Sequence, residues 1–166
     1  SEEDYPEYEL LLSNDYNLIK GRKGVIENRM FISNYFDEGE WLISLDDDIT
    51  SINGLINNDL FITFAYIRTH MEKNNIGLCG IYPTPNEFFM KTADASYDLR
   101  FCIGQMRIIR NDRYCEYRHK DFQLIEDYNT TIRYYLKYGK VMRANWISVN
   151  ADYGKLKGGM NDGNYN

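Results

Sequence analysis

The stretch "EWLISLDDDITSI", residues 40–52, places three consecutive aspartates directly after an apolar run. Residues 41–45 predict a short buried strand, because the run is too short for a helix. The adjacent carboxylates at 46–48 repel one another unless a counter-charge is present, and oxygen donors of this kind suit Mg²⁺ or Mn²⁺. The alternative is a solvated turn in which Asp48 or Thr50 caps a following helix.

Composition bounds the class of protein. The chain has 166 residues, which is one domain's worth and enough for a full core. Its formal charge of −6 argues against a nucleic-acid partner, which requires a basic face. Cys79, Cys102 and Cys115 lack metal-type spacing and predict reduced core thiols. With no signal peptide and no apolar stretch long enough to span a bilayer, the sequence predicts a cytoplasmic domain.

The rest of the chain predicts strands that alternate with helices. Apolar residues at helical spacing predict a short helix after Pro6 and longer helices at 24–35, 58–75 and 125–138. Aliphatic and aromatic runs predict strands at 17–20, 41–45, 76–83 and 140–150. Two further strands, at 86–91 and 97–111, are expected to form an antiparallel pair joined through "TADAS". This order favours an α/β sheet of mixed direction.

Two further groups of residues accompany the aspartates. Lys20, Arg22 and Lys23 lead through Gly24 into a helix that carries Arg29, and such a loop can hold a phosphate or a nucleobase edge. A solvated basic loop is the alternative. Asp46 follows Arg29 by 17 residues, one helix and one strand later, and this path brings the end of the strand near the start of the helix.

The third group, Glu126-Asp127, begins the helix at 125–138. A helix dipole favours acidic residues in the first turn, so this pair has a purely structural explanation as well.

In this order the three groups resemble the GT-A glycosyltransferases, which use nucleotide-sugar donors. In that family a "G-x-x-x-x-R" segment precedes a strand ending in Asp-x-Asp, and a later Glu-Asp pair begins a helix beneath the acceptor cleft. The chain is most similar to glycosyltransferase domains of large DNA viruses, chlorella viruses in particular. The similarity extends over residues 15–160 and rests on "ENRMFISNYFDEGEWLISLDDDI", "GIYPTPNEFFMK", "IEDYNTTIRYYLKYGKV" and "KGGM".

The resemblance implies a GT-A (Rossmann-like) α/β fold over residues 1–166, with a mixed, mainly parallel central sheet flanked by helices and a small antiparallel insertion. It implies transfer of a hexose or deoxyhexose from a UDP-sugar to a hydroxyl of a glycan acceptor, in viral glycoprotein glycan synthesis in the host cytoplasm. Mn²⁺, or else Mg²⁺, is the implied cofactor.

The resemblance also assigns roles. Asp48 and Asp46 are the metal ligands, Asp46 also serving the ribose or a metal-bound water, and Asp47 belongs to the donor site, although alternation along an extended chain turns it the other way. Asp127, beside Glu126, suits a general base in an inverting reaction, or a group that binds a sugar hydroxyl in a retaining one. The donor site further includes Arg29 and a closing segment with Lys155, Lys157, Gly158 and Gly159.

The chain departs from this family at both ends. The first βα unit, whose loop holds the nucleobase, is not found before Ser1, and the sequence stops soon after Gly159. The expectation is therefore a part of a larger, multidomain protein.

Two other functions fit parts of the pattern. "LISLDDDIT" matches the Asp-x-Asp-x-Thr signature of haloacid-dehalogenase-type phosphatases, with Asp46 as nucleophile and Asp48 as acid. A non-catalytic sugar-nucleotide binding module is the other alternative. His70 and His119 are expected to be structural or surface residues rather than metal ligands.

Overall fold

The computed structural model describes residues 5–12, 16–86, 88–90, 95–117 and 125–152. The elements are α1 (Tyr5–Leu11), α2 (Val25–Tyr35), β1 (Trp41–Leu45), β2 (Ile49–Asn53), η1 (Ile56–Asn58), α3 (Leu60–Asn74), β3 (Leu78–Ile81), β4 (Ala95–Ser96), β5 (Met106–Arg110), α4 (Arg113–Glu116), α5 (Glu126–Tyr138), β6 (Met142–Ala144) and β7 (Ser148–Ala151). The predicted α/β class is confirmed. No helix within these ranges is long and apolar enough to cross a bilayer.

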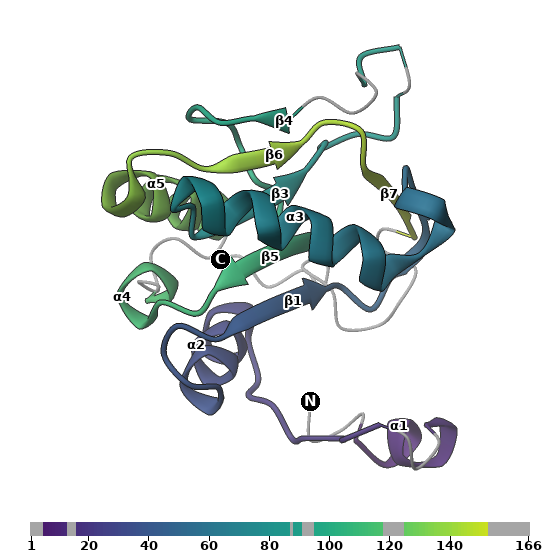
Figure 1. Ribbon diagram of the computed structural model, residues 1–166. Helices are drawn as coiled ribbons and strands as arrows, with labels where there is room; N and C mark the ends of the chain where they lie inside the picture. Colours follow the sequence, from purple (N-terminus) through teal and green to yellow (C-terminus); the bar gives the residue numbers. More distant parts are fainter. Residues whose placement is uncertain (1–4, 13–15, 87, 91–94, 118–124, 153–166) are drawn as a thin grey trace.

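The main sheet has five strands in the order β1-β5-β3-β6-β4 (Figure 1). Only the pair β3–β6 is parallel; β1–β5, β3–β5 and β4–β6 are antiparallel. The prediction of a mainly parallel sheet is therefore wrong. A parallel neighbour requires a crossover, usually through a helix. The described part of the chain between β3 and β5 contains no helix, and β5 runs back beside β3 in the opposite direction.

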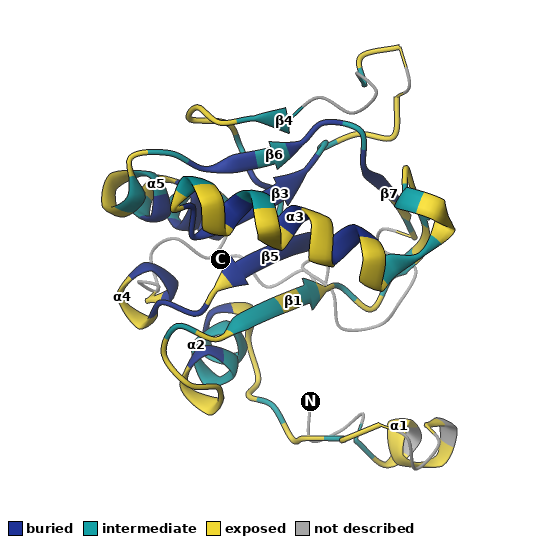
Figure 2. Ribbon diagram, viewed as in Figure 1, coloured by how far each residue is buried: buried dark blue, intermediate teal, exposed yellow. Residues whose placement is uncertain are grey.

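Each face of the sheet has its own apolar core. On one face α3 packs with Phe64, Ile67 and Met71 against alternate residues of the strands, and the buried faces appear dark blue in Figure 2. On the other face Tyr134 of α5 packs with the remaining strand residues, Cys102 and Cys115. All three cysteines are buried free thiols, as the sequence predicted.

Local signals explain where the helices begin and end. Asp59 caps α3 by accepting a hydrogen bond from the Ile62 N–H, and Asn75 ends it in the left-handed conformation. Gly139 ends α5 in the same conformation. These helices agree with the hydrophobic spacing of the sequence to within a few residues.

Several strands of the structure differ from those predicted from the sequence. Residues 17–20 form no strand, and the described part of 86–91 forms turns. Within the described ranges β4 and β5 belong to the main sheet, and no separate antiparallel insertion is found there. The single strand expected at 140–150 is divided into β6 and β7. A second small sheet pairs β7 with β2, whose register joins Ile52 to Val149. Such long-range pairing leaves little signal in either segment.

Candidate functional site

The aspartates follow β1 as the sequence predicted, and the first of them is tied to Arg29. The Arg29 guanidinium lies 3.0 Å from Asp46 Oδ1 and donates to the Ser44 hydroxyl and, over 3.3 Å, to the Gly104 carbonyl. Arg29 is only 14% exposed. Burial raises the pKa of Asp46, against the opposing charges of Arg29 and Arg107. Arg29 therefore points to the aspartate cluster, as expected.

The other two aspartates turn in different directions. Asp47 accepts a hydrogen bond of 3.0 Å from the Tyr8 hydroxyl of α1. Asp48 Oδ1 is buried without a hydrogen-bond partner in the described part of the chain, and the Asp48 carbonyl accepts from the Asp152 N–H. The chain continues into β2 rather than a helix, so the alternative in which Asp48 or Thr50 caps a helix is wrong.

Asp127 lies in the first turn of α5 and faces the start of β5. Its Oδ2 accepts a hydrogen bond of 2.8 Å from the Gly104 N–H. Burial and the neighbouring Glu126 carboxylate raise the pKa of Asp127 from 3.8 to about 6, although Arg107 opposes the shift. The approach requires glycine, because a Cβ on Gly104 would stand 2.4 Å from Asp127 Oδ1. A partly desolvated carboxylate of this kind can exchange a proton near neutral pH.

Arg107, the second residue of β5, was not identified from the sequence. Its side chain is 1% exposed, and Nη1 lies 3.8 Å from Asp127 Oδ1, which is too long for a hydrogen bond. The charges of Glu116, Glu126 and Asp127 all favour its protonated form. Among the described residues, neither Arg107 Nη1 nor Asp127 Oδ1, both buried, has a hydrogen-bond partner. The sequence did contain a signal for this residue, which is an arginine within the apolar strand "MRIIR". A cation buried in such a strand requires anions beside it, so its presence indicates nearby carboxylates.

Gly104 joins the two halves of the site. Its carbonyl accepts from Arg29, which holds Asp46, and its N–H donates to Asp127. The end of β1 and the start of α5 are thus connected through one peptide segment, although they are far apart in the sequence. Arg29 of α2, Asp46 and Asp127 are thus linked through the backbone of Gly104.

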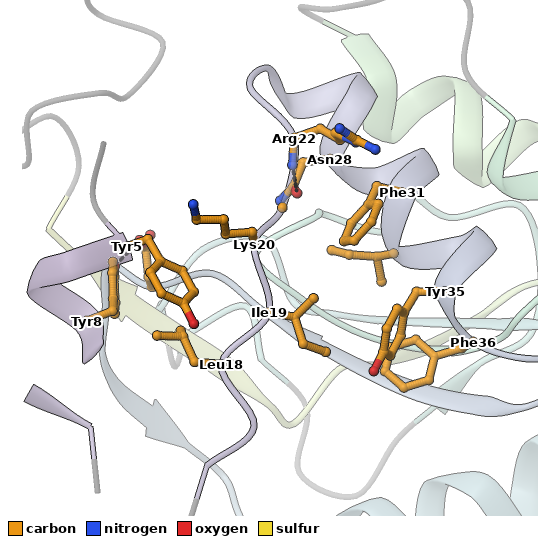
Figure 3. A pocket seen from close by; sticks show the side chains of 13 residues that line it. Tyr5, Tyr8, Leu18, Ile19, Lys20, Arg22, Asn28, Phe31, Tyr35 and Phe36 are labelled. Carbon is orange, nitrogen blue, oxygen red and sulfur yellow. Dashed lines mark hydrogen bonds between the residues drawn. The ribbon is translucent and has the colours of Figure 1, made fainter. Parts of the chain in front are cut away.

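A cavity of about 330 Å³ adjoins this site on the side of Asp47. Figure 3 shows Tyr5 and Tyr8 of α1 on one side of it and α2 aromatic rings on the other, with residues 18–20 between them. Two cations lie over these rings: Lys20 Nζ is 5.3 Å from the ring centre of Tyr5, and the Arg22 guanidinium is 5.5 Å from that of Phe31. Lys20 and Arg22 of the basic loop therefore line an aromatic cavity and do not face only solvent.

The fit of a metal ion depends on Asp46 and Asp48. The described ranges contain no group of three or more His, Cys, Asp or Glu side chains able to hold a metal ion by themselves. Mg²⁺ in nucleotide-dependent enzymes, however, is commonly held by one or two carboxylates together with substrate phosphates. Asp48 Oδ1 is buried and has no hydrogen-bond partner within the described ranges, and such an ion would satisfy this oxygen. Asp46 and Asp48 are therefore the residues that could hold such an ion together with oxygen atoms of a bound ligand.

Five residues named in the sequence analysis lie outside the described ranges: Lys155, Lys157, Gly158, Gly159 and His119. Glu126 is buried at the start of α5.

His70 lies on α3, where its Nδ1 is 3.3 Å from the Tyr97 hydroxyl and its ring packs against Tyr66. These contacts agree with the structural role predicted for His70.

Comparisons of the chain with protein-family models, with curated proteins and with solved structures found no match.

Proposed function

We propose that the chain is a metal-dependent glycosyltransferase that transfers a hexose or deoxyhexose from a UDP-sugar to a hydroxyl of a glycan acceptor. The observation that supports this proposal is the connection through Gly104, which joins the Arg29–Asp46 pair to Asp127. A group-transfer site needs donor-binding groups and a proton acceptor on opposite sides of the reacting atoms. The free thiols support a cytoplasmic location.

On the donor side, Asp46 and Asp48 would hold Mn²⁺ or Mg²⁺ together with the diphosphate. The ion, when bound, neutralises the negative charge that develops on the leaving diphosphate. Arg29 keeps Asp46 in place through its ion pair and adds a positive charge beside it. The cavity of Figure 3 adjoins Asp47, and its aromatic walls suit a stacked nucleobase.

On the acceptor side, Asp127 would accept the proton of the attacking hydroxyl. A general base works best when its pKa is close to the working pH, and burial moves the pKa of Asp127 in that direction. The Gly104 N–H orients the carboxylate through Oδ2, and Oδ1 accepts no hydrogen bond from the described residues. In a retaining reaction the same oxygen would instead bind a sugar hydroxyl.

The test is release of UDP from a panel of UDP-sugars with and without Mn²⁺, followed by transfer to glycan acceptors. We expect Mn²⁺-dependent release, which Asp48→Ala abolishes while the fold is retained. Asp98→Ala is the matched control, because Asp98 is an exposed aspartate paired with Arg100. Undiminished Mn²⁺-dependent UDP binding by Asp48→Ala in isothermal titration would contradict the assignment.

The same assay separates the alternatives. A haloacid-dehalogenase-type phosphatase using Asp46 and Asp48 would hydrolyse phosphate monoesters and leave UDP-sugars intact. A non-catalytic binding module would bind the UDP-sugar without releasing UDP. Metal-dependent UDP release is expected only of the glycosyltransferase.

A further inference from the structure

Gln105 lies where the end of β1 meets the start of β5 (Figure 1). The Asp46 N–H donates a hydrogen bond of 2.8 Å to the Gln105 carbonyl, and this bond continues the register in which Leu45 lies opposite Met106. Side chains of directly opposed residues in an antiparallel pair lie on the same face of the sheet. The register therefore places the Gln105 side chain beside Asp46.

The backbone around Gln105 is fixed by hydrogen bonds to three other elements. The Gly104 N–H donates to Asp127 of α5, and the Gly104 carbonyl accepts from Arg29 of α2. The Gln105 carbonyl accepts from Asp46 at the end of β1. A polar side chain held in a fixed position can bind a ligand with little further loss of conformational entropy. Gln105 thus has a defined place between the Arg29–Asp46 pair and Asp127.

The amide nitrogen of Gln105 is buried without a partner. The residue is 8% exposed, and its Nε2 has no hydrogen-bond partner among the described residues. Most buried polar groups are hydrogen-bonded, and an amide that leaves water without gaining a partner destabilises the fold. Arg107 Nη1 and Asp127 Oδ1, 3.8 Å apart, are in the same condition within the described ranges. Two donors and one acceptor beside this end of β5 therefore await hydrogen-bond partners.

A sugar hydroxyl fits these groups. A hydroxyl accepts a hydrogen bond from an amide N–H and at the same time donates its own proton to a carboxylate oxygen. An anionic group fits less well, because Glu126 and Asp127 bring two acidic side chains to the start of α5.

We propose that Gln105 is a specificity-determining residue whose Nε2 donates a hydrogen bond to one hydroxyl of the transferred sugar. The assignment rests on the proposed function. The transferred sugar has to lie between the leaving diphosphate and the attacking hydroxyl, and Gln105 lies between Asp46 and Asp127, the residues proposed for these two groups.

The test combines Gln105→Met with the UDP-sugar that the parent chain uses best and with its monodeoxy forms. Methionine keeps the length and the unbranched shape of the side chain and removes the amide. In the parent chain, loss of the recognised hydroxyl should lower kcat/KM for Mn²⁺-dependent UDP release by about 10–10²-fold, because it leaves the buried amide unpaired. Gln105→Met should lose a similar factor with the complete donor and little more with that one deoxy donor.

Thermal unfolding without ligand supplies a second measurement. Gln105→Met should raise Tm by about 2–4 °C, because it removes a buried polar group that has no partner in the described part of the chain. Thr130→Val is the matched control, since Thr130 Oγ1 of α5 is also buried without a partner among the described residues. This control should raise Tm as well and leave kcat/KM unchanged for every donor.

Coupling between Gln105→Met and a single deoxy donor, together with a higher Tm, supports the assignment. Losses that multiply for every deoxy donor would overturn it and leave the proposed function in place. A lower Tm of Gln105→Met would also overturn it, because the amide would then serve the fold. If the parent chain releases no UDP in the presence of Mn²⁺, the proposed function fails and this assignment fails with it.

Discussion

Replacing Asp127 with Asn removes the charge of this side chain while keeping its shape and the oxygen that accepts from the Gly104 N–H. The side chain is 24% exposed, and burial together with Glu126 raises the pKa of Asp127 from 3.8 to about 6. A pKa increase of this size means that the folded chain disfavours the ionised form of Asp127 by about 3 kcal/mol. Because the Glu126 carboxylate lies beside it, we expect the substitution to raise the free energy of unfolding at neutral pH by about 1–3 kcal/mol.

The sign follows from linkage. Because its folded pKa is raised, Asp127 binds its proton more tightly in the folded chain, and its contribution to stability falls as pH rises from about 4 to about 6. The Asp127→Asn variant has no carboxylate at this position, so this loss of stability with rising pH is absent from it. The free energy of unfolding of the variant, relative to the parent chain, should therefore increase by about 1–3 kcal/mol between pH 4 and pH 8.

Urea unfolding followed by tryptophan fluorescence at pH 4, 6 and 8 measures this difference. Asp98→Asn is the matched control and should change in the opposite direction, because the hydrogen bond from Arg100 lowers the pKa of Asp98. The same Asp127→Asn protein should lose about 10²–10⁴-fold in sugar transfer with donor binding nearly unchanged. A pH-independent stability difference would refute the desolvated carboxylate, and unchanged turnover with weakened UDP-sugar binding would refute the general base.

Three other substitutions test neighbouring parts of the structure. Gly104→Ala should displace Asp127, because the new Cβ would lie 2.4 Å from Oδ1; turnover should fall, and thermal unfolding should show about 1–3 kcal/mol of destabilisation. Arg107→Met should destabilise the fold by about 3–5 kcal/mol in urea, because it removes the cation beside buried carboxylates. Since Arg107 lowers the pKa of Asp127, the loss of transfer on acidification should also begin at a higher pH in this variant. Asp59→Ala should cost about 1 kcal/mol through loss of the α3 cap without changing turnover.

Local patterns were enough to predict the elements that carry the site. The apolar run of β1, the cap of α3 at Asp59 and the periodicity of α5 each lie within one segment, and each was predicted to within a few residues. Strand direction is a property of pairs of segments. β5 was predicted as a strand, but nothing in its own residues shows that it lies between β1 and β3 or that it opposes both.

The same limit applies to the site. Asp46 and Asp127 are charged residues at the ends of predicted elements, and Arg29 is a cation in a predicted helix that follows a basic loop, so their types and positions are visible in the sequence. Gly104 contributes only backbone groups and a lack of side-chain volume, and its role depends on an approach between segments 23 and 75 residues apart. Arg107 was overlooked because a single cation in a strand acquires meaning only from the buried carboxylates around it.

The antiparallel course of β5 accounts for the position of the site. In a parallel pair, the carboxyl end of one strand lies beside the carboxyl end of the next. Here the end of β1 lies beside the beginning of β5, with Leu45 opposite Met106. The segment just before β5 can therefore meet the aspartates that follow β1, and Gly104 contacts both Arg29 and Asp127 from this position. A parallel β5 would place Gly104 at the opposite end of the sheet, away from Asp46, and would separate the two halves of the site.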